Sequence, residues 1–374
     1  MPIELSPFVV HFGALEDPRI ERSKAHLLID LVAIAVIASL CGIDSFEGMA
    51  VFAEARLEWL KQFLQLPGGA PSHDTFSRVF ARIKPDKFQV CFIDWMKAVA
   101  TMTDGEVVAI DGKTLRHSFD RASSKAAIHM VSAWAVNNSV SLGQIKVDEK
   151  SNEITAIPRL VEALCLKGCI VTIDAMGCQR EICKKIIEAE ADYTISLKGN
   201  QGTLHDDVKE AFELLGSDDR RAVHYSTYGK GHGRTEERHA LLLSDIAEIK
   251  EKHQWPGLKS IGLVQSIRTI GEETTMEFRY FINSYVPSAR KFMDVTRSHW
   301  HVENKLHWVL DVTFHDDSSC VRKGHGAENL STVRRIAINL LKQDRATKKS
   351  IPNKQIICAA SKDYVFKLLL SKPI

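Results

Sequence analysis

Residues 107–113, VVAIDGK, mark the point where the pattern of the sequence changes. Four apolar residues are followed directly by Asp111, which predicts a short buried strand that ends in a carboxylate. The preceding hundred residues carry apolar positions at helical spacing, and residues 71–80 (PSHDTFSRVF) offer Ser72 or Asp74 as a helix cap. Past residue 107 strands alternate with helices. The sequence therefore predicts an α/β fold preceded by a helical segment.

A second stretch, residues 169–177 (CIVTIDAMG), repeats the arrangement, with an apolar strand that ends in Asp174. Residues 128–136 and 140–147 alternate as two strands, and the pattern from residue 107 to 197 reads β-β-β-α-β-α-β. This order predicts a mixed sheet with helices on both faces. Functional groups gather outside the strand ends of such a sheet. An Asp that ends a strand can also be a turn residue or a helix cap.

A third stretch, residues 297–311 (RSHWHVENKLHWVLD), is typical of a helix because good helix formers fill it and no Gly or Pro interrupts it. Written as a helix, it stacks polar side chains every fourth residue along one face: His299, Glu303, His307 and Asp311. Apolar residues at neighbouring positions could bury it: Trp300, Leu306 and Leu310. The alternative is a surface helix whose charged stripe faces water.

Composition allows a large core and more than one domain in the 374 residues. The chain has 45% apolar and 26% charged residues, which is ordinary for a globular protein. Its net charge of +2 gives no argument for nucleic-acid binding, so a nucleic-acid-binding surface would need locally clustered basic residues. The eight cysteines show no zinc-finger spacing. The apolar stretch 27–41 is broken by Asp30 and is too short to span a bilayer. We expect a soluble, cytoplasmic protein without a signal peptide at the N-terminus.

Three carboxylates that converge on one point would repel one another unless a cation offset them. Hard oxygen ligands favour Mg²⁺ or Mn²⁺. Two such ions about 3.5–4 Å apart would activate a water or a 3′-hydroxyl and stabilise the leaving oxygen of a phosphodiester. The residues thus predict metal-assisted phosphoryl transfer on DNA or RNA. A zinc site of His299, Glu303 and His307 is an alternative, but HxxxExxxH is not the HExxH pattern.

Several motifs in order resemble the H-repeat-associated group of bacterial insertion-sequence DDE transposases: AIDGKTLRHS (109–118), QIKVDEKSNEITAIP (144–158), VTIDAMGCQ (171–179), LKGNQG (197–202) and RSHWHVENKLHWVLDVTF (297–314). The resemblance covers about residues 15–345. It implies a ribonuclease-H-like mixed sheet with flanking helices, a β-rich insertion and an N-terminal all-α domain. It also implies that Asp111, Asp174 and Glu303 are the catalytic and metal-binding triad for two Mg²⁺ or Mn²⁺ ions. The partners implied are the terminal inverted repeats of the element, target DNA, and a second copy of the chain in a homodimer.

The broader family with an inserted β domain often places Tyr, Arg and Lys at fixed distances from its catalytic Glu. Here those positions are Thr296, His299 and Leu310, so these roles are not carried over. We take the neighbours Arg297, His299 and His307 as possible replacements that contact DNA. Further DNA-binding candidates follow strand ends or lie on the insertion: Lys113, Arg116, Lys198, Asn200, His232, Arg234 and Arg238. Each of these could instead be a solvated turn or hairpin residue.

The expected domains are an N-terminal helical, DNA-end-binding domain (1–103), a catalytic core (104–217 and 286–345), the β-rich insertion (218–285) and a basic C-terminal tail (346–374). Arg334 and Arg335 begin the basic segment that leads into this tail. The predicted function is cleavage and strand transfer at the ends of an insertion sequence. A metal-dependent DNA nuclease and a non-catalytic DNA-binding relic are the two alternatives.

Overall fold

The computed structural model describes residues 6–20, 24–99, 104–119, 126–148, 152–215, 221–231 and 233–370. The chain forms two compact units. The first unit comprises Met1–Thr101, Gly112–Glu149 and Glu303–Ile374, and the second comprises Met102–Asp111 and Lys150–Val302. The chain passes from the second unit to the first within strand β1 (Val107–Leu115).

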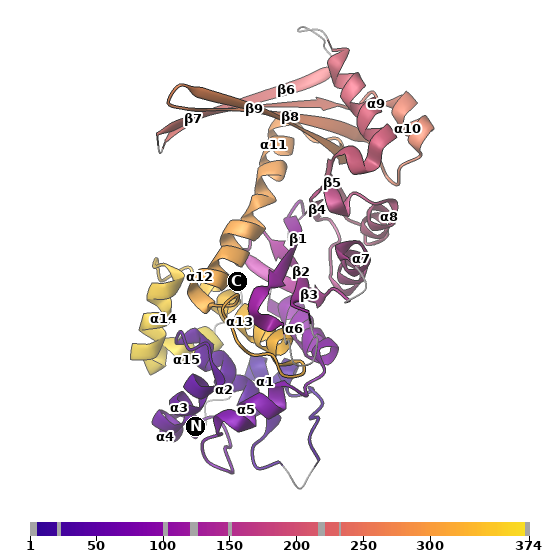
Figure 1. Ribbon diagram of the computed structural model, residues 1–374. Helices are drawn as coiled ribbons and strands as arrows, with labels where there is room; N and C mark the ends of the chain where they lie inside the picture. The colour runs from indigo at the N-terminus through magenta and orange to yellow at the C-terminus, as the bar shows by residue number, and fades with distance from the viewer. Residues whose placement is uncertain are drawn as a thin grey trace. The chain divides into compact units, whose positions relative to one another are not determined.

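The strands form a mixed sheet (Figure 1). In the first unit the strand order is β3-β2-β1, and in the second it is β1-β4-β5-β9-β8-β7-β6. β1, β4 and β5 are parallel, whereas β5 pairs with β9 antiparallel and β2 pairs with β3 antiparallel. The remaining strands are β2 (Ile128–Ala135), β3 (Val140–Lys146), β4 (Ile170–Ile173), β5 (Asp192–Leu197), β6 (Ala222–Gly231), β7 (Arg234–Leu243), β8 (Ser260–Ile270) and β9 (Glu273–Asn283). The expected mixed α/β architecture is confirmed.

Strand β4 is buried along its whole length, as expected for a parallel strand with neighbours on both edges and helices over the sheet. This explains why its sequence is continuously apolar and does not alternate. Helices α7 (Glu153–Ala163) and α8 (Arg180–Glu188) flank this part of the sheet. Ile157 and Leu160 of α7, and Ile182 and Ile186 of α8, are each no more than 1% exposed.

β6–β9 form a four-stranded antiparallel ribbon, the expected β-rich insertion (Figure 1). Helix α11 (Ala289–Ser298) packs on the base of one face, where Phe292 and Met293 contact Ala240, Leu242, Val264 and Phe281. Helix α9 (Gly202–Glu213) lies against the other face, where His205 contacts the ring of Tyr280 edge-on and Phe212 contacts it at a tilt. A short helix within the insertion, α10 (Ala247–His253), was not predicted from the sequence.

Helices make up most of the first unit, and α13 (Gly326–Gln343) lies at its centre with 15 buried residues. Buried polar side chains join α13 to the β2–β3 hairpin: Asn339 bonds both backbone groups of Ser141, and Gln144 donates to Thr332. The other helices are α1 (Ser6–Phe12), α2 (Leu28–Leu40), α3 (Phe46–Ala55), α4 (Leu57–Leu60), α5 (His73–Phe80), α6 (Pro85–Val99), α12 (Trp308–Phe314), α14 (Ile351–Ala360) and α15 (Lys362–Leu370). Ser72 caps α5, as predicted.

The C-terminal segment differs from the expected basic tail. Residues 351–370 form α14 and α15, and the ammonium of Lys354 is buried against the backbone carbonyls of Leu341 and Asp344. Arg334 and Arg335 are also buried and do not face solvent. Arg334 pairs with Asp316, and Arg335 donates a hydrogen bond to Ser132. The four expected domain boundaries stay a prediction. No helix within the described ranges is long and apolar enough to cross a membrane.

The buried ion pair between Arg334 and Asp316 generates a stability prediction, since both side chains are at most 3% exposed. We expect Arg334→Met to lower the free energy of unfolding by about 3–5 kcal/mol, because it leaves Asp316 as a buried, unpaired carboxylate. The exposed pair of Arg78 and Asp74 provides the control, and Arg78→Met should cost less than about 1 kcal/mol. Urea unfolding measures both. Equal losses in the two variants would contradict the prediction.

Candidate active site

The register of β1 and β4 relates Asp111 to Asp174. The prediction that both aspartates end their strands is correct for Asp174 but wrong for Asp111, because β1 continues to Leu115. Val107, Val108 and Ala109 pair with Ile170, Val171 and Thr172, a constant offset of 63 residues. Continued by two residues, the same offset places Asp111 beside Asp174. In-register residues of parallel strands point to the same face of the sheet, and their Cα atoms are about 4.8 Å apart. The second unit therefore offers two half-buried carboxylates at one sheet edge.

The turn after β4 holds Asp174 in place. Its Oδ1 accepts hydrogen bonds from the backbone N–H groups of Met176 (3.0 Å) and Gly177 (3.3 Å), which leaves Oδ2 to accept another ligand. Glycine is required at 177, since a Cβ atom there would lie 2.2 Å from Cγ2 of Ile173. Asn200, which follows β5, donates to the Ala175 carbonyl at 2.7 Å. Asn200 thus supports the turn that carries Asp174.

His299 also lies near Asp174. Its Nδ1 is 3.3 Å from the hydroxyl of Thr172, which precedes Asp174 by two residues and shares its face of β4. Burial lowers the pKa of His299, the carboxylate of Asp174 acts in the opposite direction, and the charge of Arg279 lowers the pKa further. The imidazole is therefore mainly neutral at pH 7.

Glu303 lies in the first unit, in a π-helical segment that spans Val302–His307. Glu303 is exposed, whereas its neighbours Val302, Leu306 and Leu310 are fully buried. The π segment has more residues per turn than an α-helix, so the predicted polar stripe is not continuous: Glu303 is exposed and His307 is buried. Trp300 was predicted to help bury this helix but is 49% exposed.

Lys113 links β1 to the helix that follows Glu303. Its side chain is buried, and its ammonium pairs with Asp311 and, at 2.8 Å, with Asp317. Arg116 reaches Asp317 at 3.4 Å from an exposed position. Burial raises the pKa of Asp311, and the hydrogen bond from Lys113 opposes this rise. Two carboxylates thus already neutralise the charge of Lys113 inside the protein.

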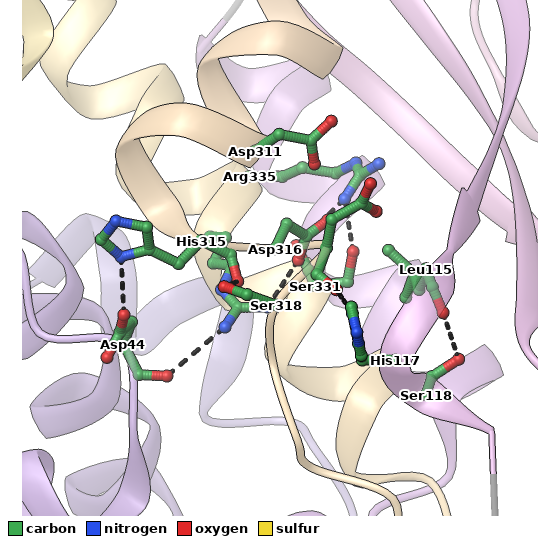
Figure 2. Close-up of polar contacts among 12 residues, drawn as sticks. Asp44, Leu115, His117, Ser118, Asp311, His315, Asp316, Ser318, Ser331 and Arg335 are labelled. Atoms are coloured by element: carbon green, nitrogen blue, oxygen red, sulfur yellow. Dashed lines mark hydrogen bonds and ion pairs between the residues drawn. The ribbon is translucent and has the colours of Figure 1, made fainter.

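The same part of the first unit holds a dense polar network (Figure 2). Arg335 is fully buried and donates to Ser331 and, at 3.0 Å, to Ser132. Figure 2 shows Arg335 near Asp311 and Asp316, and His315 directed at Asp44, where the distance is 2.7 Å. Burial, followed by the charges of Arg335 and Lys113, lowers the pKa of His307 to about 3. These contacts join α13 to β2 and the residue after α12 to Asp44.

The DNA-binding candidates from the sequence fall into three groups. Lys198 and Arg297 are exposed, and Arg234 and Arg238 lie on β7, both paired with Glu236. Lys113 and His307 are buried, in positions that a DNA backbone does not reach, so we do not carry these two further. His232 lies outside the described residues. Arg279 was not singled out from the sequence; it lies on β9, with its guanidinium carbon 5.9 Å from the ring centroid of Trp300.

The donor set at the edge of β1 and β4 suits a hard divalent cation, because both groups are carboxylates. Among the residues that the structure describes, no group of three or more His, Cys, Asp or Glu side chains forms a ready metal site. Asp111 and Asp174 belong to the second unit and Glu303 to the first.

Comparison with known proteins places the chain among transposases. Residues 102–340 match the family described as "Transposase DDE domain", and residues 9–96 match the one described as "DDE_Tnp_1-associated". The H repeat-associated putative transposase YhhI of Escherichia coli (strain K12) is 40% identical over 373 residues, which cover 98% of each chain. The putative transposase YncI of Escherichia coli O157:H7 is 39% identical, over 96% of this chain and 94% of the relative.

The buried ion pairs of Lys113 lead to a prediction for the stability of Lys113→Met. It removes the counterion of Asp311 and Asp317, which are partly exposed, so we expect a loss of roughly 1–3 kcal/mol in the free energy of unfolding at pH 7. The loss should shrink at pH 4, because protonation of the raised-pKa carboxyl of Asp311 removes the unpaired charge.

Urea unfolding at the two pH values measures this difference. Arg116→Gln is the control, since Arg116 contacts the same Asp317 from a side chain that is 79% exposed, and it should cost less than about 1 kcal/mol at either pH. A penalty for Lys113→Met that is the same at pH 4 and pH 7 would show that the ion pairs do not cause it.

Proposed function

The chain belongs to the transposase DDE-domain family, and we propose that it cleaves and rejoins DNA at the ends of its own insertion sequence by two-metal-ion phosphoryl transfer. The observation that carries this proposal is the continued register of β1 and β4, which sets Asp111 beside Asp174 on one face. Both residues lie inside the matched range 102–340, as does Glu303.

A ribonuclease-H-like core is part of the proposal. Three features support it: the antiparallel β2–β3 hairpin, the parallel strands β1, β4 and β5, and the helices α7 and α8 between them in the chain. The ribbon β6–β9 lies between Asp174 and Glu303 in the sequence, where the family resemblance expects an insertion. In this arrangement the functional edge of the sheet is the one at which β4 ends and Asp174 follows it.

Asp111, Asp174 and Glu303 are the proposed ligands for two Mg²⁺ or Mn²⁺ ions. With these ions bound, a water or a 3′-hydroxyl is activated and the leaving oxygen of the phosphodiester is stabilised. The chain's own contribution is orientation: the N–H groups of Met176 and Gly177 hold one oxygen of Asp174 and leave the other to the metal side. The exposed carboxylate of Glu303 is available for the same role.

The proposed partner is DNA, bound as the terminal repeats of the element and as target, by a homodimer on paired ends. Lys198 and Arg297 are exposed on the second unit and are candidates for phosphate contacts, as are Arg234 and Arg238 of the ribbon and Arg116 of the first unit. Such contacts position DNA without reading its sequence. Recognition of the end sequence is assigned to the N-terminal helices, where Arg78 is exposed on α5.

We predict that Asp111→Asn, Asp174→Asn and Glu303→Gln each reduce cleavage by about 1000-fold or more, because each removes a ligand from metal-assisted catalysis worth several kcal/mol. The assay is nicking of a duplex that carries the element's own ends, with Mg²⁺ or Mn²⁺ and with EDTA. DNA binding should persist in all three variants, since they lose no positive charge. Asp206→Asn, at an exposed position on α9, should cleave like the wild type.

The alternatives have distinct outcomes in the same experiment. A nuclease would cleave but would not join pre-cut ends to target DNA, whereas a transposase produces strand-transfer products. Wild-type cleavage by Asp174→Asn would refute the proposed site. A folded protein that binds the ends and never cleaves them, even as an assembled paired-end complex, would support the non-catalytic relic.

A further inference from the structure

The β6–β9 ribbon has two chemically different faces, which the strand register defines. Directly paired residues share a face, as do residues two apart on one strand. Arg238 pairs with Ser266, which pairs with Glu277, and Arg268 pairs with Glu236. One face, here called the arginine face, therefore carries Arg234, Arg238, Arg268 and Arg279 together with Glu236, Glu273 and Glu277.

The base of the arginine face is the surface on which α11 packs. Arg279 pairs with Val264, and both Val264 and Phe281 contact Phe292 or Met293 of α11 in one apolar cluster. Arg279 is thus the first charged residue on β9 beyond this cluster. Its guanidinium carbon lies 5.9 Å from the ring centroid of Trp300, just after the end of α11.

The strand register also relates Arg279 to Asp174. Ile173 pairs with Ile195 of β5, so the same register continues Asp174 opposite Ser196, which pairs with Phe281 of β9. Arg279 lies two residues from Phe281 on the same face of the sheet. His299 is fixed to β4 through the hydroxyl of Thr172, at 3.3 Å. All of these residues belong to the second unit.

A phosphodiester brought to the edge of β1 and β4 would meet two carboxylates, Asp111 and Asp174, and would need positive charge from the protein as well as from metal ions. Arg279 can supply it at low cost. Its ion-pair partner is Glu277, 3.2 Å away, whose side chain is 62% exposed. An ion pair with so exposed a carboxylate is weak, and arginine binds phosphate oxygens in a bidentate manner, so a phosphate can replace Glu277.

We infer that Arg279 is a phosphate-binding residue of the active site, where its guanidinium holds the DNA phosphate presented beside Asp174. The inference rests on the proposed function. It gives the β-rich insertion a direct part in the reaction. The guanidinium comes from Arg279 of β9, which is 105 residues further along the chain than Asp174. The other arginines of the face continue outward along the ribbon.

The test compares the full-length chain with Arg279→Gln, Arg279→Lys and Arg268→Gln in cleavage of the element's own ends. Arg268 is the matched control, since it lies on the same face and is exposed, but is further along β8 from the α11 cluster. We expect Arg279→Gln to lower kcat by about 100-fold, the effect of removing one charge-stabilising donor, with a much smaller change in KM. Arg279→Lys should recover part of the loss, and Arg268→Gln should stay within about threefold of the wild type.

Two further variants keep the outcome decisive. Arg279→Met retains the aliphatic contact with Trp300 without the charge, and it replaces Arg279→Gln if that variant does not fold. Wild-type kcat in a folded, charge-free variant overturns the inference, and so does an equal loss in Arg268→Gln. Asp174→Asn, run in parallel, separates failure of the proposed function from failure of the role of Arg279. If Asp174→Asn retains cleavage, the proposed function fails. If Asp174→Asn loses cleavage and the Arg279 variants do not, only the role of Arg279 fails.

Discussion

The constraint on which the site depends is the register between β1 and β4. Val107, Val108 and Ala109 pair with Ile170, Val171 and Thr172 at a constant offset of 63 residues, and the same offset continued by two residues aligns Asp111 with Asp174. A slip by one residue would turn one aspartate to the opposite face of the sheet, because side chains alternate along a strand. The buried, apolar residues of both strands fix the register, so burial in the core determines the position of the polar groups at its edge. The turn at Met176 and Gly177 then orients Asp174.

Several buried charged side chains in this protein are neutralised by ion pairs with neighbouring side chains. In the first unit, Lys113 joins two carboxylates and Arg334 is buried with Asp316, so cations that read as basic in the sequence serve to hold helices together. In the second unit, the ribbon carries arginines on one face, and Arg279 lies at the base of that face beside Trp300. This contrast explains how a chain with a net charge of only +2 can still present positive charge to a phosphate.

Much of the fold could be predicted from the sequence, because its signals are local. The continuous apolar runs before Asp111 and Asp174 indicated buried parallel strands, and Ser72 indicated a helix start. The site was harder. The π-helical segment at Glu303 cannot be read from residue spacing, so the exposure of Trp300 and the burial of His307 were missed. The burial of Lys113 and the position of Arg279 depend on partners far away in the chain, which periodicity does not report.

The central claim is that Asp111 and Asp174 lie side by side and bind divalent metal together. Its most direct measurement is a Mn²⁺ titration of the full-length chain, followed by electron paramagnetic resonance, for the wild type, Asp111→Asn and Asp174→Asn. The account predicts saturable binding by the wild type and the same large loss of affinity in both variants, because each removes one ligand of a shared ion. Unchanged Mn²⁺ affinity in either variant would contradict the account.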